Sequence, residues 1–223
     1  MAAEALVWLQ YIKLSPMGSR YGLSRGRRPE RSRQPLLTRH ASRNALDPND
    51  IPAALTGIDA VILTLGIRPG PEMLFRPVRL FSTATRVIVS AMQRARVARL
   101  ICVTGFGAGE SRKAVGCLES IPFQLFLGRA YEDKSLQEQL IRDSGLDWVI
   151  VRPVILTNGP ATGQYQVLEG PEQWRNGFIA RADVADFLLR QVKSDLWLRK
   201  SSVLRSSLLC IPELRVKEHA GTA

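Results

Sequence analysis

Hydrophobic and polar positions follow a regular pattern only from about residue 44 to residue 205. Within that part, short apolar runs alternate with longer segments whose apolar residues recur at helical spacing. The runs at 59–65, 99–104 and 148–151 are typical of strands buried in a parallel sheet. Weaker strand patterns lie at 164–168 and 202–204.

The segments between the runs predict helices. We expect one long helix over 74–96, a second over 131–143 with Leu136, Leu140 and Ile141 on its apolar face, and a third over 183–192. Strands that alternate with helices indicate an α/β fold with a parallel sheet. Ligands of such sheets bind beyond the carboxyl ends of the strands, which places a candidate site near 65–67, 104–106 and 152–154.

The first 43 residues do not continue this pattern. Residues 1–14 are mildly apolar and compatible with a short amphipathic helix, whereas 15–43 are rich in Arg, Ser, Gly and Pro and predict an irregular or disordered segment. The sequence therefore predicts a basic leader over 1–43, an α/β domain over 44–205 and a tail over 206–223.

Charge is concentrated in the leader. Of the net charge of +11, residues 1–46 carry nine Lys and Arg against two acids, so the rest of the chain is only mildly basic. The leader has no assigned role, or serves as a transit peptide, or binds nucleic acid. Nucleic acid is the weakest alternative, because the leader has few aromatic side chains that could stack on bases. They are Tyr11 and Tyr21, together with Trp8. We expect a cytoplasmic protein, or an organellar one if the leader is a transit peptide.

Scarce Cys and His residues exclude several chemistries. Three Cys without a CxxC pair argue against a disulfide framework, and two His argue against a His-based triad or a multi-His metal site, so no metal is expected. No apolar stretch approaches the 18 residues of a membrane-spanning helix.

Four stretches together resemble a known family, the atypical short-chain dehydrogenases/reductases, and within it the NAD(P)H-binding, NmrA-like and biliverdin/flavin-reductase-like group. They are 57–62 (GIDAVI) with Gly66, 100–105 (LICVTG), 134–138 (KSLQE) continuing to 144–148 and 151–153, and 181–185 (RADVA). The resemblance implies a Rossmann-like, doubly wound parallel sheet that binds NAD or NADP. It also implies either a reductase of a small conjugated acceptor or a non-catalytic NAD(P)-sensing or interaction protein.

The resemblance assigns the acid–base pair of the wider family only in part. Lys134 matches the family's Lys, which holds the nicotinamide ribose and lowers the pKa of a Tyr four residues earlier. That earlier position is Ala130, and Tyr131 is displaced by one residue, about 100° around a helix. Lys134 and, more weakly, Tyr131 are the candidate catalytic residues. The simpler alternative for Lys134 is an exposed pair with Glu138.

The same resemblance implies which residues contact the cofactor. Thr104 and Gly66 have simpler alternatives, as a Thr and a Gly that only end strands. Residues 105–109 (GFGAG) predict a flexible loop beside the site, and Asp183 and Asp186 favour helix-end stabilisation over catalysis. The expected cofactor contacts are Asn44, Ala45, Leu46, Gly66, Ile67, Thr104, Gly105, Lys134, Pro153 and Val154.

The largest departure from the family lies in the leader. The family begins with a strand, a GxxGxxG turn and a helix, which hold the pyrophosphate, and residues 1–43 contain no such turn. We therefore expect a sheet without its first βαβ unit, an exposed sheet edge and impaired NAD(P) binding. A frame error, a wrong start or a genuine divergence would each produce this leader. The substrate, the choice between NAD and NADP and the oligomeric state stay open.

Overall fold

The computed structural model describes residues 7–13, 37–40, 51, 55–67, 78–114 and 117–207. For 7–13, 37–40 and 117–127 it describes the backbone alone. Three of the expected cofactor contacts, Asn44, Ala45 and Leu46, lie outside the described residues, as does the tail from residue 208.

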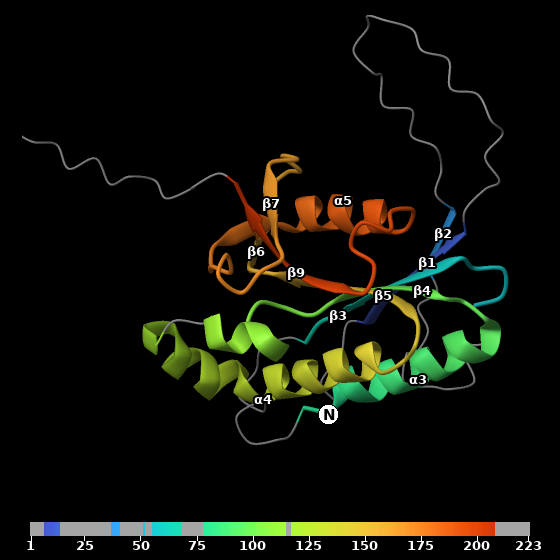
Figure 1. The fold of residues 1–223 in the computed structure, drawn as a ribbon, viewed down its shortest axis with the longest axis horizontal. Helices are drawn as coiled ribbons and strands as arrows, with labels where there is room; N and C mark the ends of the chain where they lie inside the picture. The colour runs from blue at the N-terminus through green and yellow to red at the C-terminus, as the bar shows by residue number, and fades with distance from the viewer. Residues whose placement is uncertain are drawn as a thin grey trace, which may run out of the picture.

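A mainly parallel sheet of seven strands forms the centre of the fold, in the order β2-β1-β3-β4-β5-β9-β7 (Figure 1). The four parallel strands are β3 (Ala60–Leu65), β4 (Arg99–Val103), β5 (Asp147–Pro153) and β9 (Lys200–Ser206). The antiparallel strands are β1 (Val7–Lys13), β2 (Leu37–His40) and β7 (Tyr165–Leu168). The predicted α/β fold and all five predicted strands are confirmed.

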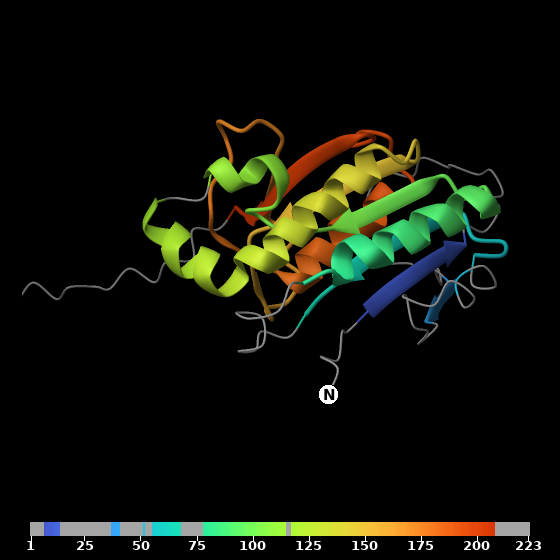
Figure 2. The same ribbon diagram turned by 90° about the horizontal axis from the view of Figure 1, so that it is seen from below.

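Helices cover both faces of this sheet (Figures 1 and 2). Helices α3 (Leu80–Ala95) and α4 (Cys117–Arg142) lie side by side on one face, and α5 (Arg181–Gln191) lies on the other. A 3-10 helix, η1 (Gly109–Ala114), follows β4, and a small parallel ribbon pairs β6 (Ile155–Thr157) with β8 (Phe178–Ala180). Each face has its own buried apolar cluster, as expected of a doubly wound sheet.

Two helices differ from the prediction in length. α3 begins at Leu80 rather than at 74, because Val78 and Arg79 are not helical, and α4 begins at Cys117 rather than at 131. Among the described residues, no helix is long and apolar enough to cross a membrane.

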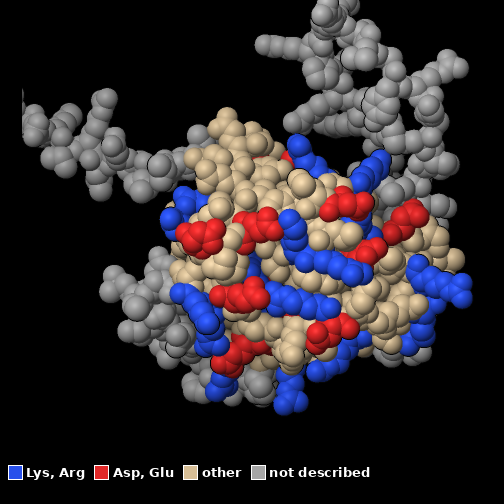
Figure 3. All heavy atoms as spheres, viewed as in Figure 1, with Lys and Arg blue, Asp and Glu red and all other residues tan. Residues whose placement is uncertain are grey.

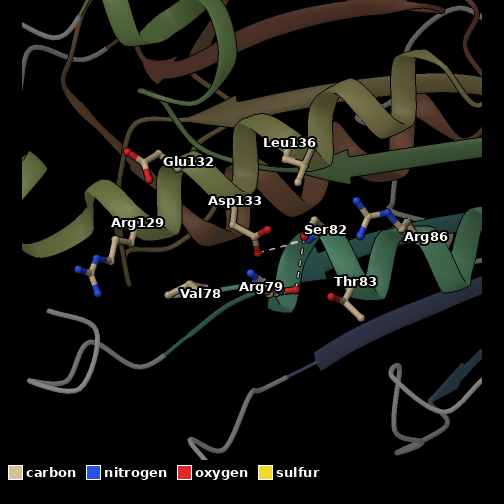
Figure 4. A pocket seen from close by; sticks show the side chains of 9 residues that line it. All are labelled: Val78, Arg79, Ser82, Thr83, Arg86, Arg129, Glu132, Asp133 and Leu136. Carbon is tan, nitrogen blue, oxygen red and sulfur yellow. Dashed lines mark hydrogen bonds between the residues drawn. The ribbon is translucent and has the colours of Figure 1, made fainter. Parts of the chain in front are cut away.

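The predicted apolar face of α4 is wrong in part. Leu136 is 40% exposed, whereas Asp133, Gln137 and Ile141 are buried. The buried positions accept polar side chains because these have partners. Asp133 accepts hydrogen bonds from the backbone N–H groups of Phe81 and of Ser82 in the first turn of α3, and Figure 4 shows the one from Ser82. Gln137 donates to the hydroxyl of Thr85.

The N-terminal prediction is also wrong where the structure describes it. Residues 7–13 form strand β1, not a helix, and β2 lies within the segment expected to be irregular. β1 pairs antiparallel with β3, from Val7 beside Leu65 to Ile12 beside Ala60. The edge of β3 that we expected to be exposed is therefore covered, because an antiparallel strand occupies the position beside it.

Candidate functional site

The carboxyl ends of β4 and β5 meet helix α4 at one edge of the sheet. The Lys134 ammonium donates a hydrogen bond to the Thr104 carbonyl oxygen, directly after β4. The same nitrogen lies 4.9 Å from the ring centroid of Phe81 and 5.5 Å from that of Tyr131. Two of the predicted site residues, Lys134 and Thr104, are therefore in direct contact.

Burial changes the acid–base chemistry of Lys134. It lowers the pKa of the ammonium from 10.5 to about 8, although the nearby Cys102 and Glu138 oppose that shift. Cys102 is buried in the core, and burial raises the pKa of its thiol far above the physiological range. With a pKa of about 8, the Lys134 ammonium is mostly protonated at neutral pH and loses its proton just above it. The Cys102 thiol stays protonated and is therefore unreactive.

The displaced Tyr131 lies on the same side of α4 as Lys134. Ala130, at the family's Tyr position, is only 2% exposed and belongs to the core cluster under α3 and α4. Tyr131 lies three residues before Lys134, and residues at that spacing share a helix face. A Cβ on Gly105 would stand 2.8 Å from the Tyr131 hydroxyl oxygen, so this position requires Gly. Burial raises the pKa of Tyr131, which keeps the phenol protonated.

An ion pair lies directly behind the site. The Arg152 guanidinium donates to both carboxylate oxygens of Glu138, at 2.9 and 2.7 Å, and both side chains are fully buried. The Thr104 hydroxyl donates to Glu138 as well, at 2.8 Å. The alternative of an exposed Lys134–Glu138 pair is therefore wrong. The Thr104 hydroxyl is directed at Glu138, and only its carbonyl meets Lys134.

The backbones of Pro153 and Val154 are engaged in the structure itself. The Pro153 carbonyl accepts from Phe106 N–H, and Val154 N–H donates to Leu204. At the end of β3, Gly66 is exposed with no atom within 4 Å of where a Cβ would stand, and Ile67 packs against the core.

The glycine-rich loop after β4 is anchored rather than flexible. Its Gly107 and Gly109 N–H groups donate to the hydroxyls of Ser111 and Ser135, each at 2.9 Å. Because Ser135 belongs to α4, the loop is tied to the helix that carries Lys134.

The two candidate carboxylates of α5 have structural partners. Asp183 accepts from Thr162 N–H, Gly163 N–H and the Thr162 hydroxyl, and so holds the loop before β7. Asp186 accepts from the hydroxyl of Tyr165 and from Arg190. These contacts favour a structural role over catalysis.

Two hollows lie beside elements that contribute to this region. A groove of about 510 Å³ opens between the first turn of α3 and the outer side of α4, lined by Arg79, Ser82 and Glu132 among others (Figure 4). A second hollow of about 390 Å³ adjoins β8 and is lined by Phe178 and Asp183 among others.

The described charged residues form neither a metal site nor, on the face drawn in Figure 3, a basic patch. Within the described ranges, no group of three or more His, Cys, Asp or Glu residues could hold a metal ion. On the face drawn in Figure 3, acidic and basic side chains are interspersed. That face offers no continuous positive surface of the kind that binds nucleic acid.

The edge of the sheet fits one end of NAD(P). No described residue fills the space beside Gly66, so a ligand has room to approach the backbone there, and an ammonium has three donors, of which Lys134 gives one to Thr104. β1 begins, rather than ends, at this edge, because it is antiparallel to β3. Its direction is therefore opposite to that of a strand that leads into a phosphate-binding turn at the cofactor edge.

Comparison with known proteins shows the family of the chain and several curated relatives. The model of the family described as NAD(P)H-binding matches residues 26–195. The chain is 32% identical over 130 residues to an uncharacterized chloroplastic protein of Arabidopsis thaliana, covering 57% of this chain and 45% of that protein. It is 30% identical over 138 residues to the uncharacterized sugar epimerase YhfK of Bacillus subtilis, covering 62% and 58%. The chain thus spans about half the length of these relatives.

Solved structures agree on the fold. ChuY of Escherichia coli CFT073 has a TM-score of 0.62 and 26% identity, over 74% of this chain and 76% of that one. ChuY of E. coli O157:H7, described as an anaerobilin reductase, has a TM-score of 0.61 and 26% identity over 75% and 74%. A short-chain dehydrogenase/reductase of Veillonella parvula in complex with NADP has a TM-score of 0.57 and 17% identity over 74% and 70%, and shows the fold alone.

Proposed function

This chain belongs to the NAD(P)H-binding family, and from that premise we propose that it is an NAD(P)H-dependent reductase of a small conjugated acceptor. The observation that carries the proposal is the Lys134 ammonium at the carboxyl end of β4, held by the Thr104 carbonyl beside Tyr131. The proposal is also supported by a similar solved structure, 26% identical to this chain, that is described as a reductase.

In this proposal Lys134 and Tyr131 have separate roles. Lys134 donates to the ribose hydroxyls and fixes the nicotinamide end of the cofactor at the sheet edge. The nicotinamide, when bound, supplies the hydride. Tyr131, whose raised pKa keeps its phenol protonated, donates the proton that the reduced acceptor needs.

The buried Glu138–Arg152 pair contributes by holding other residues of the site in place. It ties α4 to β5, and Thr104 ties β4 to the same carboxylate. Lys134 and Tyr131 are thereby held on a rigid support, which hydride transfer needs more than it needs strong acid catalysis.

A second candidate function is a non-catalytic NAD(P)-sensing or interaction protein. The antiparallel course of β1 favours it, because that strand begins at the cofactor edge, whereas a strand that leads into a phosphate-binding turn ends there. The place of action, cytoplasmic or organellar, stays a prediction. The plant relative described as chloroplastic is one reason to keep the organellar alternative.

Turnover separates the two candidates. We expect the purified protein to oxidise NADPH with at least one member of a panel of flavins, quinones and biliverdin. Lys134→Met should abolish this activity, whereas the exposed Lys193→Met should not. If NADPH binds, but no acceptor supports oxidation at any protein concentration, the sensor is the correct alternative.

A further inference from the structure

The β6–β8 ribbon exposes an apolar surface next to the candidate site. Among the described residues six large hydrophobic side chains are exposed, and three of them lie on this ribbon. They are Ile155, Leu156 and Phe178, which are 50%, 37% and 51% exposed. Ile155 and Phe178 are direct partners in the ladder, so their side chains form one surface, which we name the β6–β8 shelf.

The shelf is continuous with the carboxyl edge of the sheet. Pro153, the last residue of β5, accepts from Phe106 N–H in the loop that follows Thr104. Ile155 follows only two residues later, roughly 7 Å along an extended chain. A flat molecule that rests on the shelf can therefore reach toward the edge where Lys134 lies.

A hollow of about 390 Å³ deepens one side of the shelf, between β8 and the loop at 157–162. Its volume lies within the range of small-molecule sites. Its walls include Phe178, Ile179 and the hydroxyl-bearing Thr157, Thr162 and Ser206.

The one carboxylate in these walls has its oxygens occupied by hydrogen bonds. Asp183 is 1% exposed and accepts three of them from Thr162 and Gly163. The nearby Arg181 donates to Asn158. The described walls therefore offer hydroxyl groups, apolar surface and one hydrogen-bonded carboxylate, and no Lys or Arg is among them.

We propose that the β6–β8 shelf and its hollow form the acceptor site, and that they select flat, uncharged aromatic acceptors over phosphorylated ones. This inference rests on the proposed reductase function. Apolar walls gain free energy when they cover an aromatic ring, whereas a phosphate placed there loses water without gaining a cation.

Binding of riboflavin and of FMN, measured by quenching of flavin fluorescence, tests the proposal without turnover. The two share one ring system and differ by a phosphate. We expect riboflavin to bind at least tenfold more tightly than FMN. Phe178→Ser should weaken riboflavin binding tenfold or more and leave NADPH affinity within twofold. The control is Leu196→Ser, since Leu196 is 72% exposed and lies away from the shelf.

The possible results of these measurements distinguish the proposed acceptor site from the proposed reductase activity. Riboflavin binding that Phe178→Ser abolishes, in a protein that never oxidises NADPH, supports the site and refutes the reductase. Turnover that Phe178→Ser leaves unchanged supports the reductase and overturns the site, as does tighter binding of FMN. A dimer that Phe178→Ser dissociates in sedimentation, with riboflavin binding unchanged, makes the shelf an interface between copies and also overturns the proposal.

Discussion

Glu138 and Arg152 form a two-point ion pair that is completely buried between α4 and β5. A third contact comes from the Thr104 hydroxyl, and the Arg152 guanidinium also lies 5.2 Å from the ring centroid of Trp174. Because neither charge reaches water, each depends on the other for its stability in the fold.

Glu138→Gln is therefore expected to lower the free energy of unfolding by about 3–5 kcal/mol, because it leaves the buried guanidinium with only the exposed Glu110, 3.8 Å away, as a charged partner. Urea denaturation followed by circular dichroism measures this loss. The matched control is Glu169→Gln, which breaks the half-exposed pair of Glu169 with Lys200 at 2.9 Å. It should cost less than about 1 kcal/mol. Equal losses in the two variants would contradict the prediction.

Gly109 brings the loop after β4 against this ion pair. Its φ is +53°, and a Cβ there would stand 2.9 Å from an Arg152 guanidinium nitrogen. Gly145 has a similar φ of +71° but nothing within 4 Å of a Cβ. Gly109→Ala and Gly145→Ala both add the strain of left-handed backbone, about 1–2 kcal/mol. Gly109→Ala should cost a further 1–3 kcal/mol or so in urea denaturation, because its Cβ displaces the Glu138 carboxylate and Arg152. Equal losses of unfolding free energy in the two variants would show that the fold tolerates a Cβ this close to the ion pair.

Most of the fold could be predicted from the sequence because its signals are local. The apolar runs that became β3, β4 and β5 have Gly or Pro nearby, so their existence can be predicted directly. The end of β5 was predicted too early, because the strand continues through Arg152 and Pro153. The buried face of α4 could not be predicted, because Asp133 and Gln137 face the protein interior through contacts with α3, which lies far away in sequence. β1 was missed since its partner, β3, lies about 50 residues later.

The residues of the candidate site could be predicted from the sequence only in part. Lys134 and Thr104 were brought together by the rule that ligands meet the carboxyl ends of parallel strands. The role of Arg152 was missed, although an Arg at the end of an apolar run is a signal that a buried partner must exist. Finding that partner, Glu138, requires the packing of α4 on β5.

The depressed pKa of Lys134 predicts how stability depends on pH. The ordinary value of 10.5 falls to about 8 in the folded protein because of burial. Between these values the unfolded chain binds more protons at this group than the folded chain does. The contribution of Lys134 to stability is therefore complete above pH 10.5 and is lost as pH falls through about 8.

Urea denaturation at pH 7.0 and pH 9.5 measures this effect in the wild type and in Lys134→Met. The free energy of unfolding of the wild type should rise, relative to the variant, between the two pH values. A constant difference would mean that Lys134 titrates normally.

We expect the chain to bind NADPH weakly, with a Kd between roughly 10 μM and 1 mM, which corresponds to about 4–7 kcal/mol. β1 runs in the wrong direction to supply the phosphate-binding turn, which leaves the nicotinamide end as the better held part. Isothermal titration calorimetry gives the constant directly. Lys134→Met should weaken binding further by roughly 0.5–3 kcal/mol through the lost ribose hydrogen bonds. A submicromolar Kd in the wild type would refute this expectation.

Tyr131→Phe tests whether the displaced Tyr acts as the acid. The phenol lies beside Lys134 and stays protonated because burial raises its pKa. Its removal should lower kcat by about 10²–10⁴ with an acceptor that must take up a proton during reduction. KM for NADPH should stay within twofold, because the ring that packs on Gly105 is retained. The control is Tyr165→Phe, which removes a hydroxyl that bonds Asp186 and should leave kcat unchanged. If Tyr131→Phe also leaves kcat unchanged, the proton comes from another donor, and Tyr131 only supports the loop after β4.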